Sequence, residues 1–84
     1  MKYYETVKMY GNYSKTLGYS DEQNLYEGYD LEKAKDAADD ERRYATPAFK
    51  QEIEVREYNF NKPREEMSED EYIDAICVGY NVVY

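Results

Sequence analysis

The chain of 84 residues contains no histidine and no tryptophan, and it has a single cysteine, Cys77. Histidine is the commonest general acid–base and a frequent metal ligand, so its absence removes the usual basis for catalysis near neutral pH. Cys77 has no histidine to activate it and no second cysteine to pair with, so we expect it to be a small buried core residue. These absences predict a non-enzymatic protein in a reducing compartment.

Glycine and proline are scarce, with four and two residues respectively. The glycines are isolated from one another, so the chain has no glycine-rich phosphate loop. The two densest acidic groups, residues 36–41 and 65–71, lack the spaced aspartates of a calcium-binding loop. A metal-dependent enzyme built on carboxylates is therefore the least favoured function, and we expect no cofactor and no metal.

Long apolar runs are missing as well. The N-terminus lacks the hydrophobic run of a signal peptide, and no apolar stretch is long enough to cross a bilayer. We therefore expect a cytoplasmic protein that has no contact with membranes.

Aliphatic core residues are also few, because leucine, isoleucine, valine and phenylalanine together number 13. Such a composition is close to that of disordered chains. The 12 tyrosines offset this shortage, since each ring can bury roughly 150–250 Å² of surface. We therefore expect residues 1–84 to fold as a single domain with a largely aromatic core.

Negative charge is plentiful. Nineteen carboxylates against eleven lysines and arginines give a net charge of −8 and an isoelectric point near 4.5. Because this surface repels phosphate backbones and anionic lipids, we expect no direct binding to nucleic acid. The expected partner is a basic protein or complex that itself binds nucleic acid.

The first part of the chain reads as a strand followed by a loop. Alternating side chains predict a strand at residues 2–10, and the Gly-Asn pair after it predicts a loop over residues 11–24. Residues 24–29 form either a second strand, which the weak helix former Gly28 favours, or part of a helical turn that begins at Ser20.

Residues 49–58 alternate in the same way and predict a further strand. The apolar side changes at Tyr58, which predicts a bulge near residues 56–57. The tail at residues 80–84 has the composition of a strand and forms either an edge strand or a disordered tail.

Two helices are predicted. The first covers residues 31–45, begins after the N-cap Asp30 and has a narrow apolar stripe made mostly of alanine. The second is shorter and begins at Ser68, which has capping-box spacing with Glu71. The fold class is therefore α+β, a small antiparallel sheet of three to four strands packed against one main acidic helix and a shorter C-terminal helix.

The main helix carries a row of carboxylates on the face opposite its apolar stripe. The row is either a solvated face or a surface shaped for a basic groove. Residues one turn apart lie roughly 5–6 Å from each other along the helix, which is close to the spacing of successive phosphates along a nucleic-acid strand. The candidate acidic contact residues, including two at the start of the second helix, are Glu32, Asp36, Asp39, Asp40, Glu69 and Asp70.

The tyrosines divide between core and surface. Periodicity places Tyr3, Tyr72 and either Tyr26 or Tyr29 inward. Four others fall on the outer side of the first strand or in the loop after it, where aromatic rings beside carboxylates are typical of a binding surface. These candidate aromatic contact residues are Tyr4, Tyr10, Tyr13 and Tyr19.

The elements follow the order of a strand (KYYETVKMY), an acidic helix (DLEKAKDAADDERR) and a second strand (FKQEIEVREY). In this order, and in size, acidity and tyrosine content, the chain resembles small inhibitors encoded by bacteriophages, such as anti-CRISPR and anti-restriction proteins. The resemblance implies a non-enzymatic protein of the host cytoplasm that blocks a nucleic-acid-handling defence complex by stoichiometric binding. The alternative is a small structural or adaptor protein that self-associates, for example as a homodimer, through its strand edges and its tail at 80–84.

Overall fold

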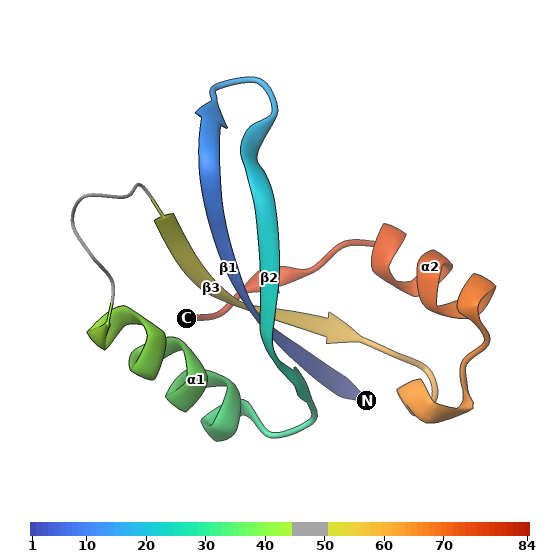
Figure 1. Cartoon of the computed structure of the whole chain (residues 1–84). Coiled ribbons are helices and arrows are strands. Elements are labelled where there is room, and N and C mark those ends of the chain that lie inside the picture. Colours follow the sequence, from blue (N-terminus) through green and yellow to red (C-terminus); the bar gives the residue numbers. More distant parts are fainter. Residues whose placement is uncertain (45–50) are drawn as a thin grey trace.

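The computed structural model describes residues 1–44 and 51–84, which form an antiparallel α+β structure (Figure 1). In chain order the elements are β1 (Lys2–Ser14), β2 (Gly18–Gly28), α1 (Leu31–Arg43), β3 (Gln51–Asn59), a 3₁₀ turn (Arg64–Glu66), α2 (Glu69–Cys77) and β4 (Asn81–Val82). The strands of the described residues form one sheet in the order β2-β1-β3-β4. The predicted fold class is confirmed.

Strands β1 and β2 form a long hairpin whose tip projects past β3 (Figure 1). The loop predicted at residues 11–24 is wrong, since β1 continues to Ser14 and β2 begins at Gly18. Gly11 does not end the strand, because its positive φ of 89° lies at a register shift between Tyr10 and Tyr13. A glycine in this conformation lets the strand pass through a bulge.

The strand predicted at residues 24–29 therefore exists but begins six residues earlier, and the helical turn at Ser20 is wrong. The additional residues are polar and acidic, and they pair with β1 from Tyr10↔Asp21 to Ser14↔Gly18. Their strand conformation depends on this pairing rather than on an apolar pattern of their own.

Helix α1 packs on one face of the sheet. Asp30 caps it by accepting hydrogen bonds from the backbone N–H groups of Glu32 and Lys33. Ala34 and Ala38 are fully buried against Tyr4 and Val55, so the small alanine side chains bring the helix close to the strands.

Two contacts hold α1 to β1. The hydroxyl of Thr6 donates to the carbonyl oxygen of Ala34 at 2.7 Å, and Lys8 Nζ lies 2.8 Å from Glu41 Oε1. Glu41 therefore fits on the inward side of the helix because a strand lysine neutralises it. The described part of α1 ends at Arg43, with Tyr44 as its C-cap, and the predicted last residue, Ala45, lies outside the described residues.

A second core lies on the opposite sheet face, under α2. It combines Tyr3, Tyr58, Phe60 and Met67, and the α2 residues that pack on it are Tyr72, Ala75 and Ile76. The inward placement predicted for Tyr3 and Tyr72 agrees with this core. The capping box formed by Ser68 and Glu71 is present, as the spacing predicts.

The bulge predicted at residues 56–57 is wrong. Pairing between β1 and β3 runs without a shift from Lys2↔Asn59 to Tyr10↔Gln51. Val55 and Tyr58 point to opposite faces, and both are buried because α1 covers one face and α2 covers the other. The change of apolar side therefore marks where one helix gives way to the other.

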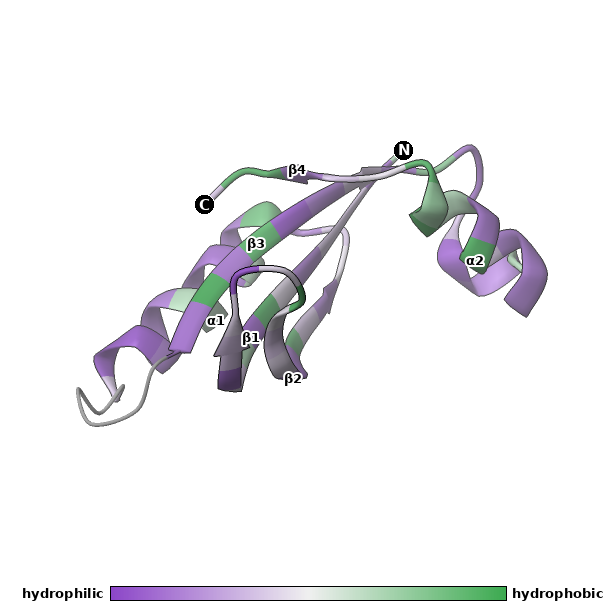
Figure 2. Ribbon diagram, turned by 90° about the horizontal axis from the view of Figure 1, so that it is seen from above, coloured by the Kyte–Doolittle hydropathy of each residue, from purple (hydrophilic) through white to green (hydrophobic). Residues whose placement is uncertain are grey.

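Cys77 was expected in the core and is exposed. Helix α2 turns Tyr72, Ala75 and Ile76 toward the sheet, so its neighbouring stripe, with Ile73 and Cys77, faces outward. Figure 2 shows hydrophilic colour over most of α1 and α2, with hydrophobic residues recurring along β3.

The C-terminal tail forms an edge strand. β4 pairs with β3 at Arg56↔Val82 and Glu57↔Asn81, and the backbone N–H of Val83 donates to Val55. The ring of Tyr84 then reaches α1, where its hydroxyl contacts both carboxylate oxygens of Asp39 at 2.8 and 2.9 Å. Within the described ranges, no helix is long and apolar enough to span a membrane.

Candidate partner-binding surface

The structure separates the four tyrosines predicted to form one exposed surface. The prediction that Tyr4 lies on an exposed surface is wrong, because only 7% of the residue is exposed and it packs against α1. β1 lies inside the sheet, between β2 and β3, and α1 covers the face that the sequence pattern assigned to solvent. Tyr10 is exposed on this same face, with Lys8 Nζ 5.6 Å from its ring centre.

Tyr13 and Tyr19 lie opposite each other across the hairpin, with ring centres 5.0 Å apart. Together they form one wall of a cavity of about 360 Å³, which we call the hairpin pocket. Its lining residues are Met9, Tyr13, Leu17, Gly18, Tyr19, Glu22, Glu52, Glu54, Arg56 and Tyr80.

Arg56 occupies the inner end of the hairpin pocket. Its Nε donates to Glu54 Oε1 at 2.6 Å, and its NH2 group donates to Glu22 Oε1 at 3.1 Å. The ring of Tyr80 lies over the guanidinium, with the ring centre 4.6 Å from Cζ. Burial lowers the pKa of Arg56, but the hydrogen bonds that it donates to Glu54 and Glu22 outweigh burial and raise the pKa overall.

The outer end of the hairpin pocket contains Glu52 and the buried hydroxyl of Tyr19. Burial raises the pKa of Tyr19, and the carboxylate of Glu52 raises it further. The pocket thus has three carboxylates, one guanidinium and three tyrosine rings, which gives it an excess of negative charge beside aromatic surface.

The sequence did not single out Glu22, Glu52, Glu54, Arg56 or Tyr80, because they come from separate strands and the tail. The alternation in β3 places Glu52, Glu54 and Arg56 on one face, which the sequence identifies only as the polar side of a strand. Only the pairing of β1 with both neighbours shows that the hairpin tyrosines lie on the same face.

The acidic row of α1 is present but largely neutralised within the helix. Glu32 lies 3.9 Å from Lys35, Asp39 lies 3.6 Å from Arg42, and Asp40 lies 3.7 Å from Arg43. Asp39 also accepts the Tyr84 hydrogen bonds. Among the described residues, only Asp36 of the row has no ion pair, so the local pairs reduce the field that a partner would meet.

The segment from residue 61 to residue 78, which contains α2, is more acidic. It contains six carboxylates and two cations. Lys62 pairs with Glu71, and Arg64 lies 3.6 Å from Glu69. The hydrogen bond from Lys62, followed by the one from the Ser68 backbone, lowers the pKa of Glu71.

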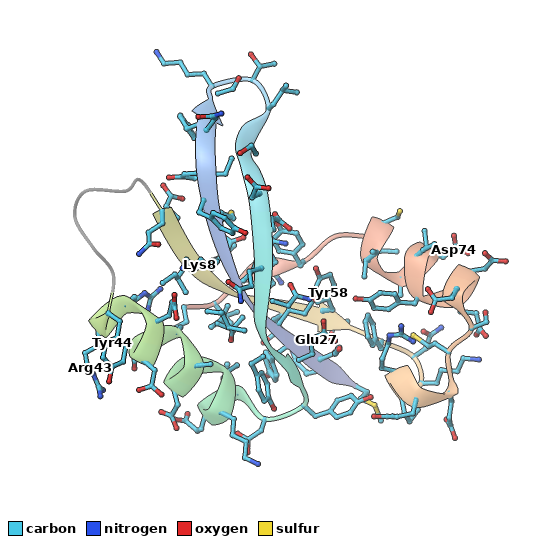
Figure 3. The ribbon with its side chains drawn as sticks, in the orientation of Figure 1. Lys8, Glu27, Arg43, Tyr44, Tyr58 and Asp74 are labelled. Carbon is cyan, nitrogen blue, oxygen red and sulfur yellow. The ribbon has the colours of Figure 1, made fainter. Side chains whose placement is uncertain are left out.

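Four further carboxylates of this segment, including the predicted Asp70, form no ion pair with any described residue and are exposed: Glu65, which accepts a hydrogen bond from Tyr29, Glu66, Asp70 and Asp74. Figure 3 shows Asp74 on the side of α2 that points away from the sheet. Beside α2 a hollow of about 590 Å³ combines an apolar floor, formed by Phe60, Met67 and Ala75, with the carboxylates of Glu71 and Asp74.

The hairpin pocket and α2 lie on the same face of the sheet. Arg56 and Glu54 point to the face that carries Tyr3 and Tyr58, on which α2 packs. We call this side, with the hairpin pocket and the exposed carboxylates of α2, the α2 face. The structure therefore brings Tyr13 and Tyr19 together with Glu69 and Asp70 on one side, while Tyr10 lies on the side of α1.

Within the described residues, no group of three or more cysteines, aspartates or glutamates is arranged to hold a metal ion. Comparison of the chain with protein-family models, with curated proteins and with solved structures gave no match. The arguments about function below therefore rest on the residues and geometry of this chain.

Proposed function

We propose that this protein is a non-enzymatic inhibitor of a bacterial defence complex that handles nucleic acid, in the manner of anti-CRISPR proteins. It binds a basic surface of that complex stoichiometrically and denies nucleic acid access to it. The observation that carries the proposal is the α2 face, where carboxylates with no ion pair among the described residues lie on the same side of the sheet as the aromatic hairpin pocket.

Both parts of this face suit a basic protein partner. The exposed carboxylates of α2 supply long-range attraction to lysines and arginines, which raises the rate of association. The tyrosines of the hairpin pocket supply apolar contact area and hydrogen-bonding hydroxyls, which are typical of the residues that dominate binding energy. The expected contact residues are therefore Tyr13, Tyr19, Glu69 and Asp70, rather than the internally paired row of α1.

The test is a cleavage assay with a panel of purified CRISPR effector–guide complexes and restriction enzymes. We expect one of them to lose DNA cleavage at a one-to-one ratio of this protein to enzyme, with no turnover. We also expect the inhibition to weaken as salt rises, because the attraction is screened. If every enzyme keeps full activity, or if a small fraction of a molecule per enzyme is enough to inhibit, the proposal is wrong.

Matched triple variants locate the contact. Glu66→Gln, Asp70→Asn and Asp74→Asn on the α2 face remove the same charge as Glu32→Gln, Asp36→Asn and Asp40→Asn on α1. We expect the first triple to raise the inhibitory concentration about tenfold or more, and the second to change it by about twofold at most. Equal effects would mean that net charge, and not the α2 face, determines binding.

A further inference from the structure

The hairpin pocket has the composition of a receptor for one cationic side chain. It contains three carboxylates, Glu22, Glu52 and Glu54, against one guanidinium, Arg56. Its volume of about 360 Å³ lies near the lower end of the range for small-ligand pockets, roughly 300–1,000 Å³. A single long side chain fits such a space, whereas a helix or a strand does not.

Arg56 shows how this surface holds a guanidinium. It is sandwiched by an aromatic ring, that of Tyr80, and two carboxylates, with Met9 Sδ 3.7 Å from its NH2 group. Planar stacking combined with directed hydrogen bonds to carboxylates is the arrangement that distinguishes arginine from lysine.

The outer half of the hairpin pocket repeats these parts. Tyr13 and Tyr19 take the place of Tyr80 as the aromatic wall, and Glu52 takes the place of Glu54 as the carboxylate. Glu52 is exposed, and a carboxylate can accept further hydrogen bonds beside the Tyr19 hydroxyl.

We propose that the outer half of the hairpin pocket binds an arginine side chain of the partner protein. The guanidinium stacks on the Tyr13–Tyr19 pair and donates hydrogen bonds to Glu52, while the Glu22 carboxylate adds attraction. This inference rests on the proposed function for the nature of the partner, since arginines on nucleic-acid-binding proteins normally contact phosphates. The pocket would hold one of those arginines away from its phosphate.

The test uses N-acetyl-arginine amide as the probe, with N-acetyl-lysine amide as the comparison, titrated into the isotopically labelled protein at physiological salt. We expect chemical-shift changes confined to the backbone amides of Tyr13, Tyr19 and Glu52 and their neighbours, with the lysine probe at least about threefold weaker. Changes spread evenly over the carboxylates of α1, α2 and the hairpin would overturn the proposal, as would equal binding of the two probes.

Two variants define the contact. Glu52→Gln is expected to weaken the arginine probe about fivefold, whereas Asp36→Asn, which removes the same charge from the exposed side of α1, leaves the affinity within about twofold. Tyr13→Leu keeps an apolar side chain but loses the ring face, so it should abolish the preference for arginine over lysine. If Glu52→Gln and Asp36→Asn have equal effects, the pocket has no role and the proposal is wrong.

The same variants separate this inference from the proposed function. Binding of the probe in the pocket, without inhibition of any enzyme in the panel, would refute the inhibitor and leave the arginine site standing. Inhibition that Glu52→Gln and Tyr13→Leu leave unchanged would refute the arginine site and leave the inhibitor standing.

Discussion

Thr6 joins α1 to the sheet through a hydrogen bond in a fully buried position. Its hydroxyl donates to the carbonyl oxygen of Ala34 at 2.7 Å. Thr6→Val keeps the shape of the side chain and removes the donor, so we expect the free energy of unfolding to fall by about 1 kcal/mol. Urea denaturation measures this change, provided that the slope of the transition stays the same.

Thr16→Val is the matched control for this prediction. Thr16 is exposed in the turn between β1 and β2, where its backbone N–H donates to Ser14 Oγ and is unaffected by the side chain. The control should change the free energy of unfolding by less than about 0.5 kcal/mol. If both variants lose the same stability, the loss belongs to the substitution type and not to the buried hydrogen bond.

Buried tyrosines make stability depend on alkaline pH. Burial raises the pKa of Tyr58, and the carboxylate of Glu5 raises it further; burial and then Glu27 raise the pKa of Tyr3. In the unfolded chain a tyrosine loses its proton near pH 10. Above that pH the folded state binds more protons than the unfolded state. The free energy of unfolding therefore has its highest value below about pH 10 and falls as pH rises above it.

We expect urea denaturation to reveal this fall between about pH 9 and about pH 11, and Tyr58→Phe to make it shallower because one of the retained protons is removed. Tyr44→Phe changes an exposed ring and serves as the control, which should keep the dependence of the parent chain. A Tyr58→Phe protein with an unchanged dependence on pH would show that folding does not raise the pKa of Tyr58.

At the scale of elements, the two helices are held by different means. α1 contacts β1, β2 and β3, and is capped by Asp30, whereas α2 contacts β3 and depends on the Ser68–Glu71 capping box. We expect Ser68→Ala to cost about 1 kcal/mol and to speed amide hydrogen exchange within α2 while α1 keeps its protection. Hydrogen exchange followed by mass spectrometry on peptides measures both helices at once.

Asp30→Ala is the reciprocal variant, with a similar expected cost and faster exchange in α1. Because α1 covers the core of Ala34, Ala38 and Val55, its opening should come close to global unfolding, so exchange in the strands should rise as well. If Ser68→Ala also speeds exchange throughout the sheet, α2 belongs to the same cooperative unit as α1 and the sheet, and this prediction is wrong.

Local signals explain which elements were predictable from the sequence. Asp30 and Ser68 are side-chain caps that act within one turn, so both helix starts were correct. The alternation in β1 and β3 located those strands as well. Residues 18–23 of β2 were not predicted as a strand, because these polar residues form a strand only by pairing with β1. Their own sequence has no alternation that would indicate it.

The candidate binding surface was less predictable than the fold, because the exposure of its residues depends on which face each helix covers. Tyr4 and Tyr10 are an even number of residues apart on β1 and therefore point to the same face, opposite to that of Tyr3. Helix α1 nevertheless buries Tyr4 and leaves Tyr10 exposed. Tyr13 and Tyr19 lie beside carboxylates, but these carboxylates come from β2 and β3 and not from the acidic helix.

For the whole molecule, the distribution of charge matters more than its total. Three carboxylates of α1, Glu32, Asp39 and Asp40, are matched by cations one turn away, whereas the six carboxylates of the segment 61–78 exceed its two cations. The hairpin pocket adds a further excess of negative charge on the side of α2. The α2 face thus has a larger excess of negative charge than the face that α1 covers, and under the proposed function this difference would orient a basic partner.

The outer edge of β2 determines whether the molecule also associates with itself, which is the basis of the alternative adaptor function. No described strand pairs with this edge, and Asp21 and Glu22 lie on β2 near its middle. Antiparallel pairing of the β2 edges of two copies would place the carboxylates of one copy close to those of the other. Such like charges on neighbouring strands destabilise the pairing of the two copies. We therefore expect sedimentation velocity at neutral pH and low salt to show a monomer of 10.1 kDa.

The double variant Asp21→Asn, Glu22→Gln removes this repulsion and should give a mass that rises with protein concentration. The control Glu66→Gln, Asp70→Asn removes the same charge away from the edge and should remain monomeric. A parent chain that already sediments as a dimer would favour the adaptor, because its edge would then associate despite the carboxylates. Dimerisation of both double variants would instead show that net charge keeps the copies apart, and the edge residues would have no special role.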